Sequence, residues 1–160
     1  MEFIRYDGYK HIKGTKIHVI VSSEALPLSI QLGPRDKHDF NYFIPILESL
    51  SVKYMGRPRS RPKEVTGDSA YDTKEIREYL KSRRVKANID INKKNRRKPK
   101  HGRPCRLDKK TYKRMRSAVE RFFAWITSFR RITIRYERLA IMFLGFIQLA
   151  CIVILLRVFR

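Results

Sequence analysis

The sequence has few cysteines and few acidic residues, and both shortages narrow the possible functions. It contains two cysteines, Cys105 and Cys151, and neither has a cysteine or histidine partner at metal-ligand spacing. A disulfide framework and a zinc site are therefore not expected, and a reducing, intracellular setting fits this cysteine usage. The first residues contain no apolar stretch of signal-peptide type, so we expect no secretory signal.

Acidic residues number 15 against 37 Lys and Arg, which gives a formal net charge of +22 in 160 residues. Such an excess favours a polyanionic partner, and nucleic acid is the first candidate. Hydrophobic residues make up 42% of the chain, which is too much for a disordered basic tail. The length predicts one domain spanning residues 1–160.

Apolar residues recur with the spacing of strands in some segments and with the spacing of helices in others. The predicted strands are 15–22, 26–32, 64–68 and 85–91, the first two forming a hairpin. The predicted helices are one that begins at Asp39, one at 73–83 with capping-box spacing at Asp72 and Glu75, and one from Asp108 to Arg131. Strands and helices in this order predict an α/β sheet.

The last apolar run, at 139–158, predicts a terminal helix. The 18 residues from 139 to 156 carry no charge and are just long enough to raise the possibility of a membrane span. Gln148 would lie near mid-bilayer, and the sheet needs apolar cover, so we expect a packed helix and no membrane. A membrane-anchored basic protein stays open as an alternative.

A basic loop is predicted at 92–107, where apolar residues are almost absent. Between Lys81 and Arg116 there are seventeen Lys and Arg against Asp90 and Asp108 alone. This density predicts contact with a phosphate backbone through counterion release. The residues expected to contact nucleic acid are Lys93, Lys94, Arg96, Arg97, Lys98, Lys100, Arg103, Arg116 and Arg121.

Two acidic residues stand where chemistry is possible. Asp68 follows a predicted strand and Glu120 lies on a predicted helix. Each has an ordinary explanation, since Gly-Asp-Ser is a common turn and Glu120 can pair with Arg116 one helical turn earlier. Together they are typical of carboxylates that hold magnesium ions for in-line phosphoryl transfer.

Segments in a fixed order carry a resemblance to a known family. They are 13–18, 26–28, 37–39, 67–72, 116–125, 130–132 and 135–138. The set resembles the C-terminal half of DDE transposases of IS-five-like insertion sequences, in the IS-four superfamily, and it covers essentially the whole chain. The resemblance implies an RNase H-like (retroviral integrase-like) mixed sheet with flanking helices, Mg²⁺ or Mn²⁺ as cofactor, and cleavage and rejoining of DNA at transposon ends by a homodimer.

By position, Asp68 resembles the second catalytic acid of that family and Glu120 the third. The first acid normally lies on a strand upstream of the Lys-Gly-Thr-Lys segment, so the chain is expected to lack the first catalytic strand. Asp7 matches only the link before that segment and is not assigned a catalytic role. No helix-turn-helix pattern precedes the first strand, so sequence-specific end recognition is not expected.

These observations favour a transposase fragment or frameshift-partner product that is inactive alone. It is expected in the cytoplasm with the nucleoid, and no small-molecule substrate is expected. The alternative is a non-catalytic basic protein that binds nucleic acid.

Overall fold

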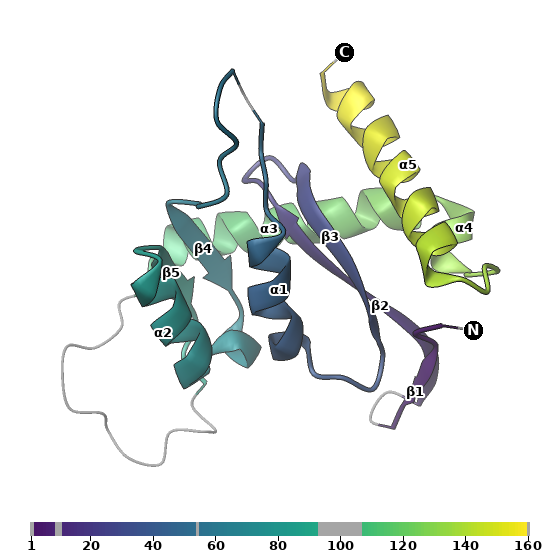
Figure 1. Cartoon of the computed structure of the whole chain (residues 1–160), viewed down its shortest axis with the longest axis horizontal. Coiled ribbons are helices and arrows are strands. Elements are labelled where there is room, and N and C mark those ends of the chain that lie inside the picture. The colour runs from purple at the N-terminus through teal and green to yellow at the C-terminus, as the bar shows by residue number, and fades with distance from the viewer. Residues whose placement is uncertain (1, 9–10, 54, 93–106, 160) are drawn as a thin grey trace.

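The computed structural model describes residues 2–8, 11–53, 55–92 and 107–159, and places helices on both sides of two small sheets (Figure 1). Strands β1 (Arg5–Asp7), β2 (Ile12–Val21) and β3 (Pro27–Pro34) form an antiparallel sheet in the order β1-β2-β3. Strands β4 (Glu64–Gly67) and β5 (Lys86–Ile89) form a parallel pair. The predicted α/β organisation is confirmed, but the described strands form two sheets rather than one.

The antiparallel sheet is built on the predicted hairpin. Ile17 lies opposite Leu32, and the turn closes where Ala25 N donates to Ser22 O at 3.1 Å. β2 begins at Ile12, earlier than predicted, because β1 extends the ladder by pairing Arg5 with Gly14. β1 itself was not predicted.

The first helices are short; the second of them packs against β2 and β3, and the last against β5. They are η1 (Asp39–Tyr42), α1 (Phe43–Glu48), η2 (Ser69–Tyr71) and α2 (Lys74–Ser82). The predicted cap at Asp72 is wrong by one residue, since Thr73 Oγ1 accepts from Ile76 N at 3.2 Å. The Asp72 carboxylate is instead almost buried, where it pairs with Arg77 and accepts from Asn92 N.

The C-terminal helices are α3 (Lys109–Thr127), α4 (Arg130–Thr133) and α5 (Ala140–Val158). Asp108 caps α3 as predicted, because Oδ1 accepts from the backbone N–H groups of Lys110 and Thr111, both at 3.1 Å. The predicted continuation to Arg131 is wrong, since the helix ends at Thr127 with Ser128 as its C-cap, and α4 begins at Arg130 after Phe129. Most of the predicted basic loop, 93–106, lies outside the described residues.

Two apolar clusters hold the elements together, and α3 crosses behind both sheets (Figure 1). The first cluster lies between the hairpin, α3 and α5, and has the fully buried Phe122 and Ile147 at its centre. The second lies between α1, α2 and β5, and contains Leu47, Ile76 and Leu80. Side chains of β2 pack against both clusters. Among the described residues, packing against common helices joins the two sheets, and no ladder does.

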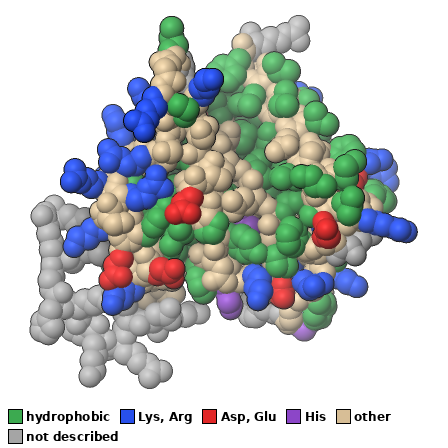
Figure 2. All heavy atoms as spheres, viewed as in Figure 1, with side chains coloured by type: hydrophobic (Ala, Val, Ile, Leu, Met, Phe, Trp, Pro, Cys, Tyr) green, Lys and Arg blue, Asp and Glu red, His purple; other side chains and the backbone are tan. Residues whose placement is uncertain are grey.

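Helix α5 is apolar on both faces but only one face is packed. Phe143, Ile147 and Ile154 are buried, whereas Ile141, Leu149 and Leu156 are more than half exposed. Figure 2 shows this apolar surface over α5, while Lys and Arg gather along the protruding 51–63 segment. The predicted packed helix is thus confirmed for one face alone. Within the described residues, α5 is the one helix whose length and hydropathy would suffice to cross a membrane.

Candidate active site

Asp68 lies at the carboxyl end of β4, where the chain turns into η2. Its Oδ1 accepts a hydrogen bond from Ala70 N at 2.9 Å, so the carboxylate caps that short turn. The side chain is exposed. The carboxyl end of a strand in a parallel sheet is the usual place for ligand-binding side chains in α/β folds.

A second carboxylate, that of Asp39, acts on the same tyrosine as Asp68, although the sequence pattern indicated it only as the start of a helix. η1, which begins at Asp39, packs against η2. Burial raises the pKa of Tyr71 to about 12, and the negative charges of Asp39 and Asp68 add to this rise. Lys16 Nζ binds Asp39 Oδ1 at 2.9 Å and neutralises part of that charge. The segment 37–39 is one of those that carry the family resemblance, so the sequence did contain a signal for Asp39.

Glu120 lies on α3, the helix that packs against β4. Its Oε1 accepts from Arg116 Nε at 3.0 Å, and both side chains are about two-thirds exposed. The hydrogen bond to Glu120 raises the pKa of the Arg116 guanidinium. The ordinary ion pair considered from the sequence is therefore present. Arg121, one residue further, donates to Ser117 Oγ at 3.3 Å and to Ser23 O at 3.4 Å.

Asp68 and Glu120 thus lie on adjacent elements, and no described hydrogen bond or ion pair joins their side chains. Magnesium takes six oxygen ligands in octahedral geometry. Within the described residues no group of three or more His, Cys, Asp or Glu side chains converges on one point. The two carboxylates do not by themselves fit a resident metal ion.

The residues that flank the basic loop are bound near the carboxyl end of the β4–β5 pair, where Asp68 also lies. In the parallel register Gly67 lies opposite Ile89, and Asp90 N donates to Gly67 O at 3.4 Å. At the far end of the segment, Asp108 N donates to the buried Asn88 Oδ1 at 2.9 Å and Asp108 O accepts from Asn88 Nδ2 at 3.2 Å. The chain therefore leaves the sheet at the carboxyl ends of β4 and β5, where Asp68 lies, and returns beside Asn88 of β5. Seven of the nine predicted nucleic-acid contacts, from Lys93 to Arg103, lie outside the described residues.

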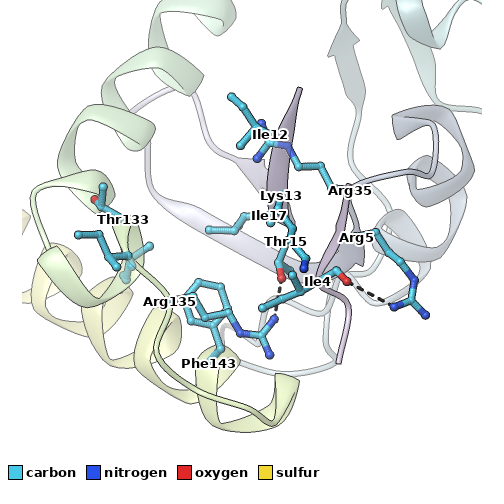
Figure 3. A pocket seen from close by; sticks show the side chains of 13 residues that line it. Ile4, Arg5, Ile12, Lys13, Thr15, Ile17, Arg35, Thr133, Arg135 and Phe143 are labelled. Carbon is cyan, nitrogen blue, oxygen red and sulfur yellow. Dashed lines mark hydrogen bonds between the residues drawn. The ribbon is translucent and has the colours of Figure 1, made fainter. Parts of the chain in front are cut away.

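A separate pocket of about 800 Å³ lies between the start of β2 and the segment around α4 (Figure 3). Lys13, Arg35 and Arg135 line it together with several isoleucines and Phe143. Neither Asp68 nor Glu120 is among its lining residues. Two segments of the resemblance that are far apart in the sequence, 13–18 and 130–138, meet here.

Arg135 joins these two segments. Its guanidinium donates to Thr15 Oγ1 at 2.6 Å and to Glu2 O at 2.9 Å, and it lies 5.0 Å from the centre of the Phe143 ring. Figure 3 shows the side chain reaching from the α4–α5 link toward β2. Burial lowers the pKa of Arg135. Its hydrogen bonds are made within the protein, so this arginine fixes the fold of the pocket wall.

A net charge of +22 on an α/β domain is typical of proteins that bind nucleic acid. A family model described as a transposase DDE domain matches residues 2–155. A candidate transposase of insertion sequence element IS402 from Burkholderia cepacia is 30% identical over 143 residues, which are 88% of this chain and 62% of that relative. A candidate transposase of insertion sequence element IS6501 from Brucella ovis is 32% identical over 144 residues, 89% of this chain and 98% of the relative. No solved structure gives a significant match.

The chain therefore belongs to the DDE transposase family of insertion sequences. The resemblance seen in the sequence is confirmed, and membership implies an RNase H-like α/β fold. The chain spans 62% of the length of its IS402 relative and nearly all of its IS6501 relative.

Proposed function

We propose that this chain is part of the machinery that cleaves and rejoins DNA at the ends of an insertion sequence, with Asp68 and Glu120 as two of its catalytic acids. The observation that carries this proposal is the family match over residues 2–155. The position of Asp68 at the end of β4, with the Glu120 helix packed on that strand, supports it.

The basic segment is proposed to hold DNA beside Asp68. Its two ends are fixed to the β4–β5 edge by the Asn88–Asp108 hydrogen bonds and by the bond from Asn92 N to Asp72 Oδ2. Lys and Arg at this edge would bind phosphates and bring the backbone of the DNA to the exposed carboxylate. We expect such a protein to be located with the nucleoid and to pair two DNA ends as a homodimer.

DNA binding is tested by the anisotropy of a labelled duplex at rising salt. Replacing Arg96, Arg97 and Lys98 by Gln should flatten the slope of log K against log salt by about 0.9 for each phosphate that the variant no longer neutralises. The matched control replaces Arg57, Arg59 and Arg61, which lie on the protruding 51–63 segment. Equal effects of the two triple variants would show that the position of the charge does not matter.

We further propose that the chain lacks the strand with the first acid and is inactive alone. The unpaired edges of β2 and β4 in the described structure support this proposal. The isolated chain is expected to produce no nicks in supercoiled DNA with Mg²⁺ or Mn²⁺. Metal-dependent nicking that disappears in Asp68→Ala would contradict the claim of inactivity.

The remaining acids are proposed to contribute to a divalent-metal site that a further carboxylate completes. Paramagnetic broadening of backbone amide signals by Mn²⁺ tests this without any need for activity. Broadening around residues 68 and 120 should weaken in Glu120→Gln and persist in Glu78→Gln. The control is closely matched, because Glu78 is also an exposed helical acid that pairs with a cation one turn earlier, Lys74. A non-catalytic nucleic-acid-binding protein would show the same broadening in both variants.

A further inference from the structure

Helix α5 carries a row of apolar residues on the side that faces away from the core. This outer row consists of Met142, Gly145, Leu149, Ile152 and Leu156. Its four large side chains are each more than half exposed, and Figure 2 shows apolar surface over this helix. The opposite side of α5 packs against α3 and β3. A helix that is apolar all round normally has all of its faces covered, so the outer row lacks a partner within the described residues.

The outer row has the spacing of a coiled-coil seam. Its members follow one another at intervals of three, four, three and four residues. This alternation averages about 3.5 residues per turn, so the row can meet a partner helix along its whole length. A helix that lies on a membrane surface instead has Lys and Arg on its polar face, whereas α5 has no charge from 139 to 156. The spacing and the composition therefore point to another helix as the occupant.

Gly145 leaves a gap in the outer row. It lies in the interior of a 19-residue helix, where glycine is the least favourable residue after proline. A Cβ at this position would meet no described atom within 4 Å, so packing within the described chain does not require a glycine. In a helical seam, such a gap can receive a large side chain from the facing helix.

A groove beside the outer row enlarges this surface. It has a volume of about 340 Å³, lies between α4 and α5, and is lined by Phe146, Leu149 and Val153 among others. The exposed apolar side chains of this face are Ile141, Met142, Leu149, Ile152, Val153 and Leu156. Burial of on the order of 80 Å² for each of them would bury about 1,000 Å² over two copies, which is the lower limit for a specific interface.

We propose that the outer row of one chain packs antiparallel against the outer row of a second copy. The row fits itself about a two-fold axis. When Gly145 lies opposite Leu156 of the other copy, Leu149 lies opposite Ile152, and each contact occurs twice. Each copy thus fills the gap in the other. This pairing requires neither DNA nor a metal ion, so it goes beyond the proposed function.

Charge favours both this occupant and this orientation. Two copies that each carry +22 approach most easily at a surface without Lys or Arg, and the outer row is such a surface. Arg138 and Arg157 flank the uncharged part of α5. Parallel pairing would bring each arginine next to its own counterpart. Antiparallel pairing separates the like charges and places opposite ends of the two helix dipoles together.

Sedimentation equilibrium of the full 160-residue chain without DNA tests the pairing, in salt that screens the net charge. The chain should sediment as a dimer. Leu149→Lys should weaken the dimer at least tenfold, because it buries a charge at the centre of the interface. The control Val158→Lys lies on the same helix outside the outer row, where the side chain is 45% exposed, and should change dimerisation less than twofold. A monomeric wild type, open-ended aggregation, or equal effects of the two variants would overturn the proposal.

A double variant that combines Leu149→Glu with Ile152→Lys tests the orientation. In the antiparallel pair each introduced Glu faces an introduced Lys, so the double variant should dimerise at least tenfold more tightly than either single variant. In a parallel pair Glu would face Glu and Lys would face Lys. Dimerisation of the double variant that is weaker than that of both single variants would therefore overturn the antiparallel arrangement.

Gly145→Leu tests the register without a change of charge. The substitution favours the helix of the single chain, so circular dichroism should show no loss of helix. It fills the gap that Leu156 of the other copy occupies, and the dimer should weaken at least tenfold. A dimer as tight as that of the wild type would place Gly145 outside the interface and overturn the proposed register.

A lipid surface is the other occupant that an exposed apolar helix could have. Cosedimentation with neutral phosphatidylcholine vesicles tests it, because neutral lipid does not attract the net charge. The dimer should stay in the supernatant. Vesicle binding by a monomer that is lost in Leu149→Lys would assign the outer row to lipid and overturn the proposal. None of these measurements involves DNA cleavage, so their failure leaves the proposed function untouched.

Discussion

The antiparallel sheet and the parallel pair are held in different ways. The β2–β3 hairpin packs Ile17, Val19 and Ile30 against an apolar cluster formed with α3 and α5. The β4–β5 pair is also fixed by polar links, among them Asp72 with Arg77 and Asn88 with Asp108. The stability of the hairpin therefore depends mainly on apolar packing, whereas the β4–β5 pair, which carries Asp68 at its carboxyl end, depends also on a few directional bonds.

We expect the largest loss of stability from a substitution in the apolar cluster between the hairpin, α3 and α5. Phe122 is fully buried in the cluster beneath the hairpin. Phe122→Ala should lower the free energy of unfolding by about 4 kcal/mol, because it removes apolar packing and leaves a cavity. Urea denaturation followed by circular dichroism measures the loss. The exposed Phe159, 75% accessible, supplies the control Phe159→Ala, and a similar loss in that variant would contradict the assignment.

The stability of the region around the β4–β5 pair should depend strongly on Asp72. Its side chain is 4% exposed and pairs with Arg77, which is 18% exposed. Asp72→Ala leaves the guanidinium without its carboxylate and should cost about 3 kcal/mol. The same denaturation measurement applies, with the exposed Glu75→Ala on α2 as control. A loss below that of Glu75→Ala would show that apolar contacts alone hold this region.

A glycine of the hairpin tests how tightly this part of the chain is packed. A Cβ at Gly33 would lie 2.6 Å from the Tyr42 ring and 2.9 Å from His18 Nε2. Those rings are stacked at 4.2 Å and have little room to move. Gly33→Ala should therefore cost about 2 kcal/mol through overpacking. Gly14→Ala, on the paired strand, meets only the Arg35 side chain at 3.4 Å and should be close to neutral.

The smallest effect concerns alkaline pH. Burial raises the pKa of Tyr71 to about 12, above the value of about 10 for an unfolded chain. The stability linked to neutral Tyr71 is present below pH 10 and is lost as the pH rises toward 12. The difference in urea midpoint between wild type and Tyr71→Phe should therefore change between pH 9 and pH 11. Tyr136→Phe, at an exposed position, should show no such change.

The sequence predicted the elements whose signals are local. The hairpin followed from two short β-branched and aliphatic runs separated by three residues, and Asp108 was identified as a cap because the helical apolar pattern of α3 follows it. β1 was missed because its three residues have strand geometry only through pairing with β2. The cap at Asp72 was misplaced because that carboxylate instead binds Arg77 and the backbone N–H of the distant Asn92.

The candidate site could be predicted only in part. Asp68 and Glu120 were found through their positions and the resemblance, and their catalytic roles stay predictions. The joint effect of Asp39 and Asp68 on Tyr71 could not be predicted, because it depends on how η1 packs against η2. The unpaired edges of β2 and β4 were equally out of reach, since an unpaired strand and a paired one have the same side-chain pattern.

The uncovered face of α5 makes ionic strength a control with two opposite effects. At low salt, mutual repulsion between molecules of charge +22 keeps these faces apart, and the proposed attraction to DNA would be strongest. Salt at 0.1 M screens both forces beyond about 10 Å. Self-association through α5 is then expected to increase as the proposed DNA affinity falls, so conditions that would detach the protein from DNA should also favour its precipitation.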